Sequence, residues 1–123
     1  MDLLEEYRRA TMFFESGDPG GAARLLEPIV AAEPENASVR QLLARAYFAS
    51  AQLVRAEEQL RALLEIDPSD HYAHHVLGRT LERQGRPEEA LGSLRIAAAM
   101  RPDNDDYRAA LRRVEARTGG RPR

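Results

Sequence analysis

The 123-residue sequence contains no cysteine and no lysine. Without cysteine it has no disulfide, no thiolate nucleophile and no cysteine-based zinc site. All 18 basic residues are arginine, which we attribute to genomic base composition. The formal net charge is −2, so no global attraction draws the chain to nucleic acid or acidic membranes. A basic start with a long apolar run, as in a secretory signal, and a stretch of membrane-spanning length are also missing. We therefore expect a cytoplasmic protein without nucleic-acid or membrane partners.

The composition favours helix throughout. Alanine, leucine, glutamate and arginine dominate, and all four are good helix formers. Hydrophobic residues make up 43% and charged residues 31%, which is typical of a soluble globular chain rather than a disordered one. The length suits a single domain that folds without disulfide or metal staples.

A constant interval organises the chain, because three prolines lie 34 residues apart. These are Pro34, Pro68 and Pro102. Two residues after each proline stands a preferred helix N-cap, namely Asn36, Asp70 and Asn104. Because proline is unfavourable inside a helix, each junction is expected to end one helix and begin another.

Small and large apolar residues repeat with the same interval. The small columns are Ala10, Ala44 and Gly78, and Ala22, Ala56 and Ala90. The large columns are Phe13, Tyr47 and Leu81, and Leu26, Leu60 and Leu94. Small residues let two helices approach closely, and large residues fill the space beside them. Gly17 and Gly85 predict a turn in mid-repeat, with Pro19 and Pro87 starting the next helix. Each repeat is therefore one helical pair.

These columns resemble the tetratricopeptide repeat, in three tandem copies over about residues 3–104. The resemblance implies an all-α fold, a right-handed superhelical solenoid of stacked antiparallel helix pairs with seven helices. The expected helices lie near 3–16, 19–33, 37–50, 53–67, 71–84, 87–100 and 104–117. The repeats span about 3–36, 37–70 and 71–104, and a capping helix covers 104–117. Together they form a single domain over 3–117, and 118–123 is expected to be a disordered basic tail.

Two features depart from the family pattern. Ala51 stands where the other copies have the turn glycine, so this turn is expected to be strained or differently shaped. Polar residues occupy a column that is usually large and apolar in this family, which predicts a looser outer seam. They are Glu6, Arg40 and His74.

The sequence contains no catalytic constellation, so we expect no enzyme and no cofactor. The carboxylate pairs, such as Glu57-Glu58, lie early in predicted helices, where the helix dipole favours negative charge. His71 and His75 have the i, i+4 spacing that could chelate a metal, but the nearby Asp70 is already the expected N-cap. We therefore predict no metal site and interpret the histidines as a surface cluster with His75 in the groove, although the spacing leaves metal binding open.

In this family, peptides bind the concave groove lined by the first helix of each pair. The resemblance implies that the groove residues are Tyr7, Thr11, Phe14, Gln41, Arg45, Phe48, Tyr72, His75, Arg79 and Arg113. Arg45, Arg79 and Arg113 are 34 residues apart, and guanidinium forks suit carboxylates. The expected ligand is an extended peptide with acidic side chains or a free C-terminus. Alternatively, the arginines are solvated and Arg79 pairs with Glu82 at i, i+3.

One use of the family is disfavoured. Members with a carboxylate clamp hold the acidic C-termini of heat-shock chaperones with lysine, asparagine and arginine. The matching positions here are Tyr7, Thr11, Leu42, Tyr72 and Val76, which supply neither a cation nor an amide. The favoured function is an adaptor that binds an acidic peptide of another protein. The alternative is self-association through the groove or a solenoid end, giving a homo-oligomer with no separate ligand.

Overall fold

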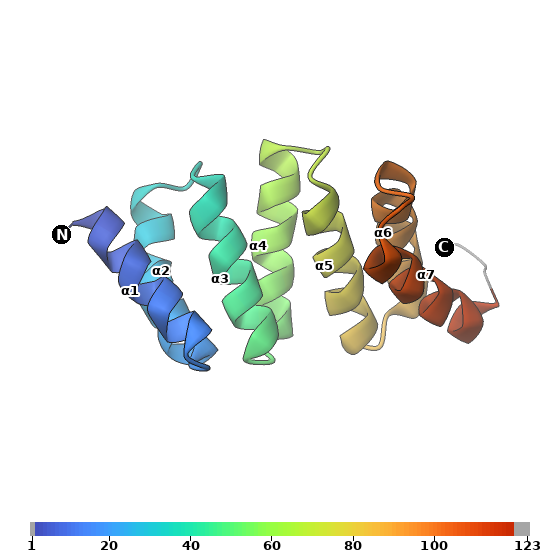
Figure 1. Ribbon diagram of the computed structural model, residues 1–123, viewed down its shortest axis with the longest axis horizontal. Coiled ribbons are helices and arrows are strands. Elements are labelled where there is room, and N and C mark those ends of the chain that lie inside the picture. Colours follow the sequence, from blue (N-terminus) through green and yellow to red (C-terminus); the bar gives the residue numbers. More distant parts are fainter. Residues whose placement is uncertain (1, 120–123) are drawn as a thin grey trace. The chain divides into compact units, whose positions relative to one another are not determined.

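A computed structural model describes residues 2–119, which form seven α-helices and no strand (Figure 1). The helices are α1 (Leu3–Glu15), α2 (Pro19–Ala32), α3 (Ala37–Ala49), α4 (Leu53–Ile66), α5 (His71–Arg83), α6 (Pro87–Met100) and α7 (Asp105–Thr118). The all-α helical repeat is thus confirmed. The chain divides into two compact units, an N-terminal unit over Met1–Ile66 and a C-terminal unit over Asp67–Arg123, where the sequence predicts one domain.

The helices begin where the sequence places capping residues. At each proline junction the predicted side chain accepts a hydrogen bond from a backbone N–H three residues later. The pairs are Asn36 with Val39 (3.2 Å), Asp70 with Ala73 (3.0 Å) and Asn104 with Tyr107 (3.0 Å). Such a cap satisfies one of the N–H groups that a helix start leaves unpaired. The first turn of each of these helices is therefore stabilised by an N-cap hydrogen bond, and the capping residue recurs every 34 residues.

The mid-repeat turns share one geometry. Gly17 and Gly85 have φ of 90° and 77°, and Ala51 has φ of 61°, the single non-glycine residue with positive φ among residues 2–119. In all three turns a backbone N–H returns to a carbonyl five residues earlier. These bonds are Asp18 to Phe13 (2.8 Å), Gln52 to Tyr47 (2.8 Å) and Arg86 to Leu81 (3.0 Å). The Ala51 turn is therefore strained, as predicted, but not differently shaped.

The core of each unit lies between its helices and follows the small and large columns, except at Phe13 of the first large column, which is exposed. Ala22, Ala56 and Ala90 are fully buried, as predicted. Leu26, Leu60 and Leu94 are buried beside them. In the other small column, an added Cβ at Gly78 would lie only 2.4 Å from Leu94 Cδ2. The pattern of small residues therefore marks the closest approaches of neighbouring helices.

The polar column expected to loosen the outer seam instead holds the proline junctions. Two of its members, Arg40 and His74, and the equivalent Arg108 bind the carbonyl oxygen of the junction proline six residues earlier. The pairs are Arg40 with Pro34 (2.7 Å), His74 with Pro68 (2.9 Å) and, one repeat later, Arg108 with Pro102 (3.0 Å). A charged or ring donor at this position thus satisfies a carbonyl that a helix end leaves unpaired. The column substitutes hydrogen bonds for apolar packing.

The C-terminal helix covers the third helical pair as predicted. Val114 is fully buried, Tyr107 and Ala110 are buried, and Leu111 is half-buried, in a helix that packs on α6. The predicted start of the tail at residue 118 is wrong, because Thr118 is helical and buried and its hydroxyl donates to Val114 O (3.1 Å). Gly119 ends the helix in the left-handed conformation. The predicted tail over 120–123 lies outside the described residues.

Candidate functional site

The N-terminal unit carries six of the predicted groove residues on two neighbouring helices. Tyr7, Thr11 and Phe14 follow one another on α1 at intervals of three or four residues, and so do Gln41, Arg45 and Phe48 on α3. This spacing keeps each set on one helix face. All six side chains are partly exposed. The Thr11 hydroxyl already donates to Tyr7 O (3.0 Å), so its acceptor lone pairs are what it can present to a ligand.

Arg45 on α3 contacts Phe14 on α1, so it links the stripe of groove residues on one helix to the stripe on the other. Its guanidinium carbon lies 4.9 Å from the centroid of the Phe14 ring, which is a cation–π arrangement between α3 and α1. Among residues 2–119, Arg45 has no carboxylate partner. The aromatic ring therefore holds the guanidinium in place without using its N–H donors in an ion pair.

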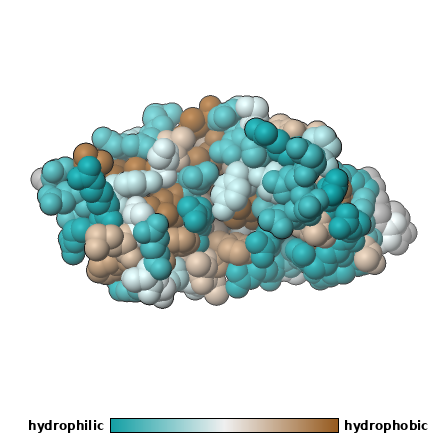
Figure 2. Space-filling view, viewed as in Figure 1, coloured by the Kyte–Doolittle hydropathy of each residue, from teal (hydrophilic) through white to brown (hydrophobic). Residues whose placement is uncertain are grey.

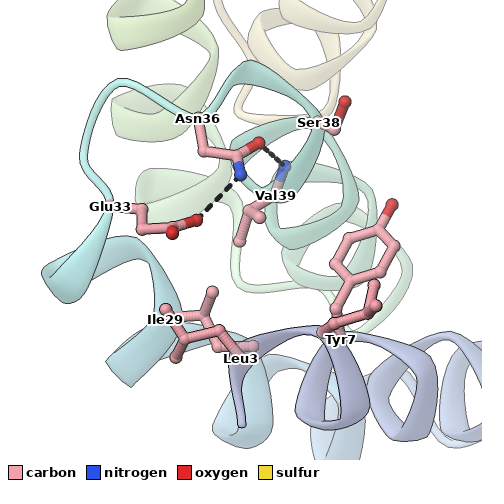
Figure 3. Close-up of a pocket in the computed structure, with 8 residues that line it drawn as sticks. Leu3, Tyr7, Ile29, Glu33, Asn36, Ser38 and Val39 are labelled. Carbon is pink, nitrogen blue, oxygen red and sulfur yellow. Dashed lines mark hydrogen bonds between the residues drawn. The ribbon is translucent and has the colours of Figure 1, made fainter.

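A cavity of about 420 Å³ opens beside this face, between the start of α1, the end of α2 and the start of α3 (Figure 3). Its lining residues are Leu3, Leu4, Tyr7, Ile29, Glu33, Asn36, Ser38 and Val39. Leu3, Ile29 and Val39 form an apolar group, while Glu33 and Tyr7 stand on opposite sides of it (Figure 3). Its size is within the range of small-molecule and side-chain pockets. Of its lining, Tyr7 is among the predicted groove residues.

The cavity depends on three helices meeting, which is why the sequence did not reveal it. Asn36 is recognisable as an N-cap, and its amide also donates to Glu33 Oε1 (3.0 Å). These two bonds hold the polar edge of the cavity. The 34-residue columns identify such positions as equivalent, but they do not say which of them leave space unfilled.

In the C-terminal unit, Arg113 already has a carboxylate partner. Its Nε and Nη2 donate to the two oxygens of Glu82 at 2.8 and 2.7 Å, and Arg117 lies 3.5 Å from the same carboxylate. These hydrogen bonds lower the pKa of Glu82 against the opposing effect of burial. The alternative left open by the sequence was a pair between Glu82 and Arg79, and the structure brings Arg113 to the same carboxylate from α7. The side chains of Arg79 and Tyr72, the other predicted groove residues of α5, are exposed and partly exposed.

His75, the remaining predicted groove residue, is only 7% exposed. Its ring stacks on Tyr107 with centroids 4.5 Å apart, and its Nδ1 has no hydrogen-bond partner within residues 2–119. Burial, followed by the nearby Arg79, lowers the pKa of His75 to about 4, so the ring is neutral at pH 7. The histidines are therefore not simply a surface cluster.

His71 also contacts Tyr107, since its Nδ1 lies 2.8 Å from the phenolic oxygen. Both histidines of the i, i+4 pair are thus turned toward one tyrosine. Within residues 2–119, no three histidine, cysteine or acidic side chains gather as metal ligands would. The pair is best understood as part of the packing between α5 and α7.

Polar and apolar side chains are interspersed on the visible surface of the described residues (Figure 2). Such a mixed surface is typical of non-obligate protein interfaces. Within the part of the chain that the structure describes, no helix has both the length and the hydropathy needed to cross a membrane.

Comparison with solved structures places the fold among known repeat domains. The first TPR of Spaghetti (RPAP3), bound to the HSP90 peptide SRMEEVD, superposes with a TM-score of 0.88 at 20% identity, over 95% of this chain and 93% of that one. The Arabidopsis OM64 TPR domain gives 0.86 at 18% identity, over 93% and 94%. MamA MSR-1 C2 gives 0.86 at 24% identity, over 98% and 69%. Identities this low show the fold alone.

Sequence comparisons agree with the fold. Anaphase-promoting complex subunit 3 of Dictyostelium discoideum is 32% identical over 79 residues, which is 64% of this chain and 8% of that subunit. Two family models, both described as tetratricopeptide repeat, match residues 13–80 and 75–119. Repeats of this kind support a protein–protein interaction module and are in general scaffolds rather than enzymes. The chain belongs to the tetratricopeptide repeat family.

Proposed function

We propose that the chain is an adaptor that binds an extended, acidic segment of another protein on the faces of its first helices. In the N-terminal unit this face consists of α1 and α3, and in the C-terminal unit of α5 and α7. The observation that carries the proposal is Arg45, which Phe14 holds at 4.9 Å and which has no carboxylate partner within residues 2–119. A ligand carboxylate would supply that partner.

Arginine suits this role because its fork matches a carboxylate with two parallel hydrogen bonds. Tyr7 and Phe14 on α1 and Phe48 on α3 add aromatic residues to the same two helices, and arginine with aromatic residues is the composition enriched at binding hot spots. Each charge-assisted bond would contribute about 1.5–3 kcal/mol before ordering costs. Attraction between exposed charges is screened within about 8 Å at physiological ionic strength, so affinity should fall as salt rises.

The C-terminal unit is expected to contribute less. Glu82 already accepts both bonds from Arg113, so an acidic ligand must compete with this internal carboxylate. Arg79 is exposed on the same helix as Glu82. We therefore expect Arg45 to govern binding more than Arg113.

An acidic ligand also has a parallel among proteins of this fold, since the RPAP3 domain was solved with the peptide SRMEEVD. The present chain would hold acidic groups differently. Tyr7, Thr11 and Leu42 stand where the carboxylate-clamp members carry cations and amides. The proposed partner is therefore an acidic segment other than a clamp-type chaperone C-terminus.

The test is affinity capture from the native lysate with the double variant Arg45→Glu, Arg79→Glu. A charge-matched control is Arg24→Glu with Arg112→Glu, because both arginines are exposed on other helix faces. We expect a protein that binds the wild type and the control but not the groove variant, and that high salt releases. Equal retention by all three chains would contradict the proposal.

Self-association is the second candidate, and one observation favours it. Met12 is 66% exposed and Phe13 37% exposed on α1, an unusual amount of apolar surface for neighbouring residues. Light scattering over a concentration series separates the two functions. A mass that rises with concentration, and that Met12→Glu returns to the monomer value, would favour self-association.

A further inference from the structure

The cavity of the N-terminal unit has a counterpart in the C-terminal unit two repeats later. Adding 68 residues, twice the repeat length, relates Leu3 to His71, Tyr7 to His75 and Val39 to Tyr107. The first two positions lie on the first helix of a pair, and the third lies early in the helix that follows the pair. The two units therefore build the same place in the fold with different side chains.

In the C-terminal unit an aromatic side chain fills this place. Tyr107 is 4% exposed, its ring stacks on His75, and its hydroxyl is 2.8 Å from His71 Nδ1. The space between α5 and α7 at this level thus accommodates a complete tyrosine side chain.

In the N-terminal unit the corresponding residue is Val39, whose side chain has no ring to reach across. The space stays open as the cavity of about 420 Å³, bordered by Leu3, Ile29 and Val39 (Figure 3). Leu4, at its edge, is 59% exposed, and Ser38 beside it is exposed. A space that has apolar side chains on one side, polar side chains on the other and an exposed edge is open to a side chain that arrives from solvent.

We propose that this cavity is a specificity pocket that binds one aromatic side chain, tyrosine or phenylalanine, of the partner segment. This inference rests on the proposed function, because the same segment would place a carboxylate on Arg45. The ligand ring would contact Leu3, Ile29 and Val39, as the Tyr107 ring contacts the histidines of the C-terminal unit. In the N-terminal unit the partner thus supplies the aromatic side chain that Tyr107 supplies in the C-terminal unit.

The helix geometry predicts the spacing of the two anchors. Ser38 and Arg45 are seven residues apart on α3, which is about 10 Å at 1.5 Å per residue. An extended peptide advances about 3.3 Å per residue, so about three residues span this distance. The segment should therefore carry its aromatic residue three positions from its acidic residue.

The test uses four synthetic peptides of one length, titrated against the chain and followed by methyl NMR of Leu3, Leu4, Ile29 and Val39. The parent peptide is acetyl-Gly-Tyr-Ala-Ala-Glu-Gly-amide, and a second reverses the order of Tyr and Glu. The other two replace Tyr by Ala and Glu by Gln in whichever order binds more tightly. We expect the Tyr-to-Ala change to weaken binding at least fivefold and to abolish the shifts of these methyl groups.

Two variants of the chain close the pocket. The first, Leu3→His with Tyr7→His and Val39→Tyr, copies the arrangement of the C-terminal unit. The second, Ser38→Trp, covers the opening from an exposed position and so tests the pocket even if the first variant does not fold. In a folded pocket-closing variant, peptides with Tyr and Ala should bind equally, whereas Arg45→Glu should keep the preference for Tyr.

The outcomes separate this inference from the proposed function. Suppose that the wild type binds the Tyr and Ala peptides equally, and that the Arg45→Glu variant binds neither. The aromatic pocket is then overturned, and the proposal of an acidic segment stands. If no peptide binds, both are overturned for linear segments. If light scattering shows a dimer without peptide, and the Ser38→Trp variant is a monomer, then a second copy of the chain occupies the pocket. In that case the pocket proposal is overturned.

Discussion

Replacing Gly78 by alanine should destabilise the protein, although alanine occupies the same column in the two preceding repeats. Gly78 lies inside α5, where alanine is favoured over glycine by about 0.5–1 kcal/mol. Against this gain, the new Cβ would lie 2.4 Å from Leu94 Cδ2, 2.5 Å from Leu94 Cγ and 3.3 Å from Ala90 O. Leu94 is fully buried and cannot turn away, and overpacking of this kind costs about 1–3 kcal/mol. The net expectation is a loss of about 1–2 kcal/mol.

Gly92→Ala is the matched control. Gly92 lies inside α6, is exposed, and an added Cβ would meet nothing within 4 Å. This substitution should therefore raise stability by about 0.5–1 kcal/mol, because only the helix preference acts. Urea unfolding followed by circular dichroism measures both changes, provided that the transition remains two-state. If Gly78→Ala stabilises the protein as much as Gly92→Ala, then α5 and α6 separate easily to the spacing of the other pairs. In that case the close approach at Gly78 contributes no stability.

Three further predictions follow from the backbone and from one buried ring. Ala51→Gly should stabilise the protein by about 1 kcal/mol in urea unfolding, because φ at this residue is 61°; a loss of stability would refute the strain. Pro28 lies inside α2, so Pro28→Ala should raise the melting temperature by restoring a backbone N–H to the helix, and an unchanged or lower melting temperature would contradict this. His75 should make folding sensitive to acid, since its pKa is about 4 when folded and 6.5 unfolded. Stability present above pH 6.5 should fall by at most about 1.4 kcal/mol per pH unit down to pH 4, and His75→Phe should remove this slope.

Much of the fold could be predicted from the sequence because its signals are local. A proline, an N-cap and a glycine each act within a few residues, so their 34-residue interval predicted the helix ends to within one residue. Pro28 shows where local reasoning stops. The same rule that ends helices at Pro34 would have ended α2 at Pro28, yet the helix continues to Ala32. Packing of the apolar face of α2 outweighs the lost hydrogen bond there.

The candidate site was less predictable. Helical periodicity predicts which residues of α1 and α3 share a face, so three groove residues could be assigned to one face of each helix in advance. Whether each arginine is open to a ligand depends on residues far away in the chain. Glu82 and Arg113 are 31 residues apart, and only the packing of α5 beside α7 brings them to 2.7 Å.

The sequence by itself therefore determined the repeat, the helix ends, the turns and the columns of small residues. These depend on backbone conformation and on side-chain size, which act at short range and recur with the period. Tertiary structure alone decided that Glu82 binds Arg113, that His75 is buried, and that Val39 leaves a cavity where Tyr107 fills one. Such outcomes depend on how side chains from separate helices share one space, and a column of equivalent positions does not contain that information.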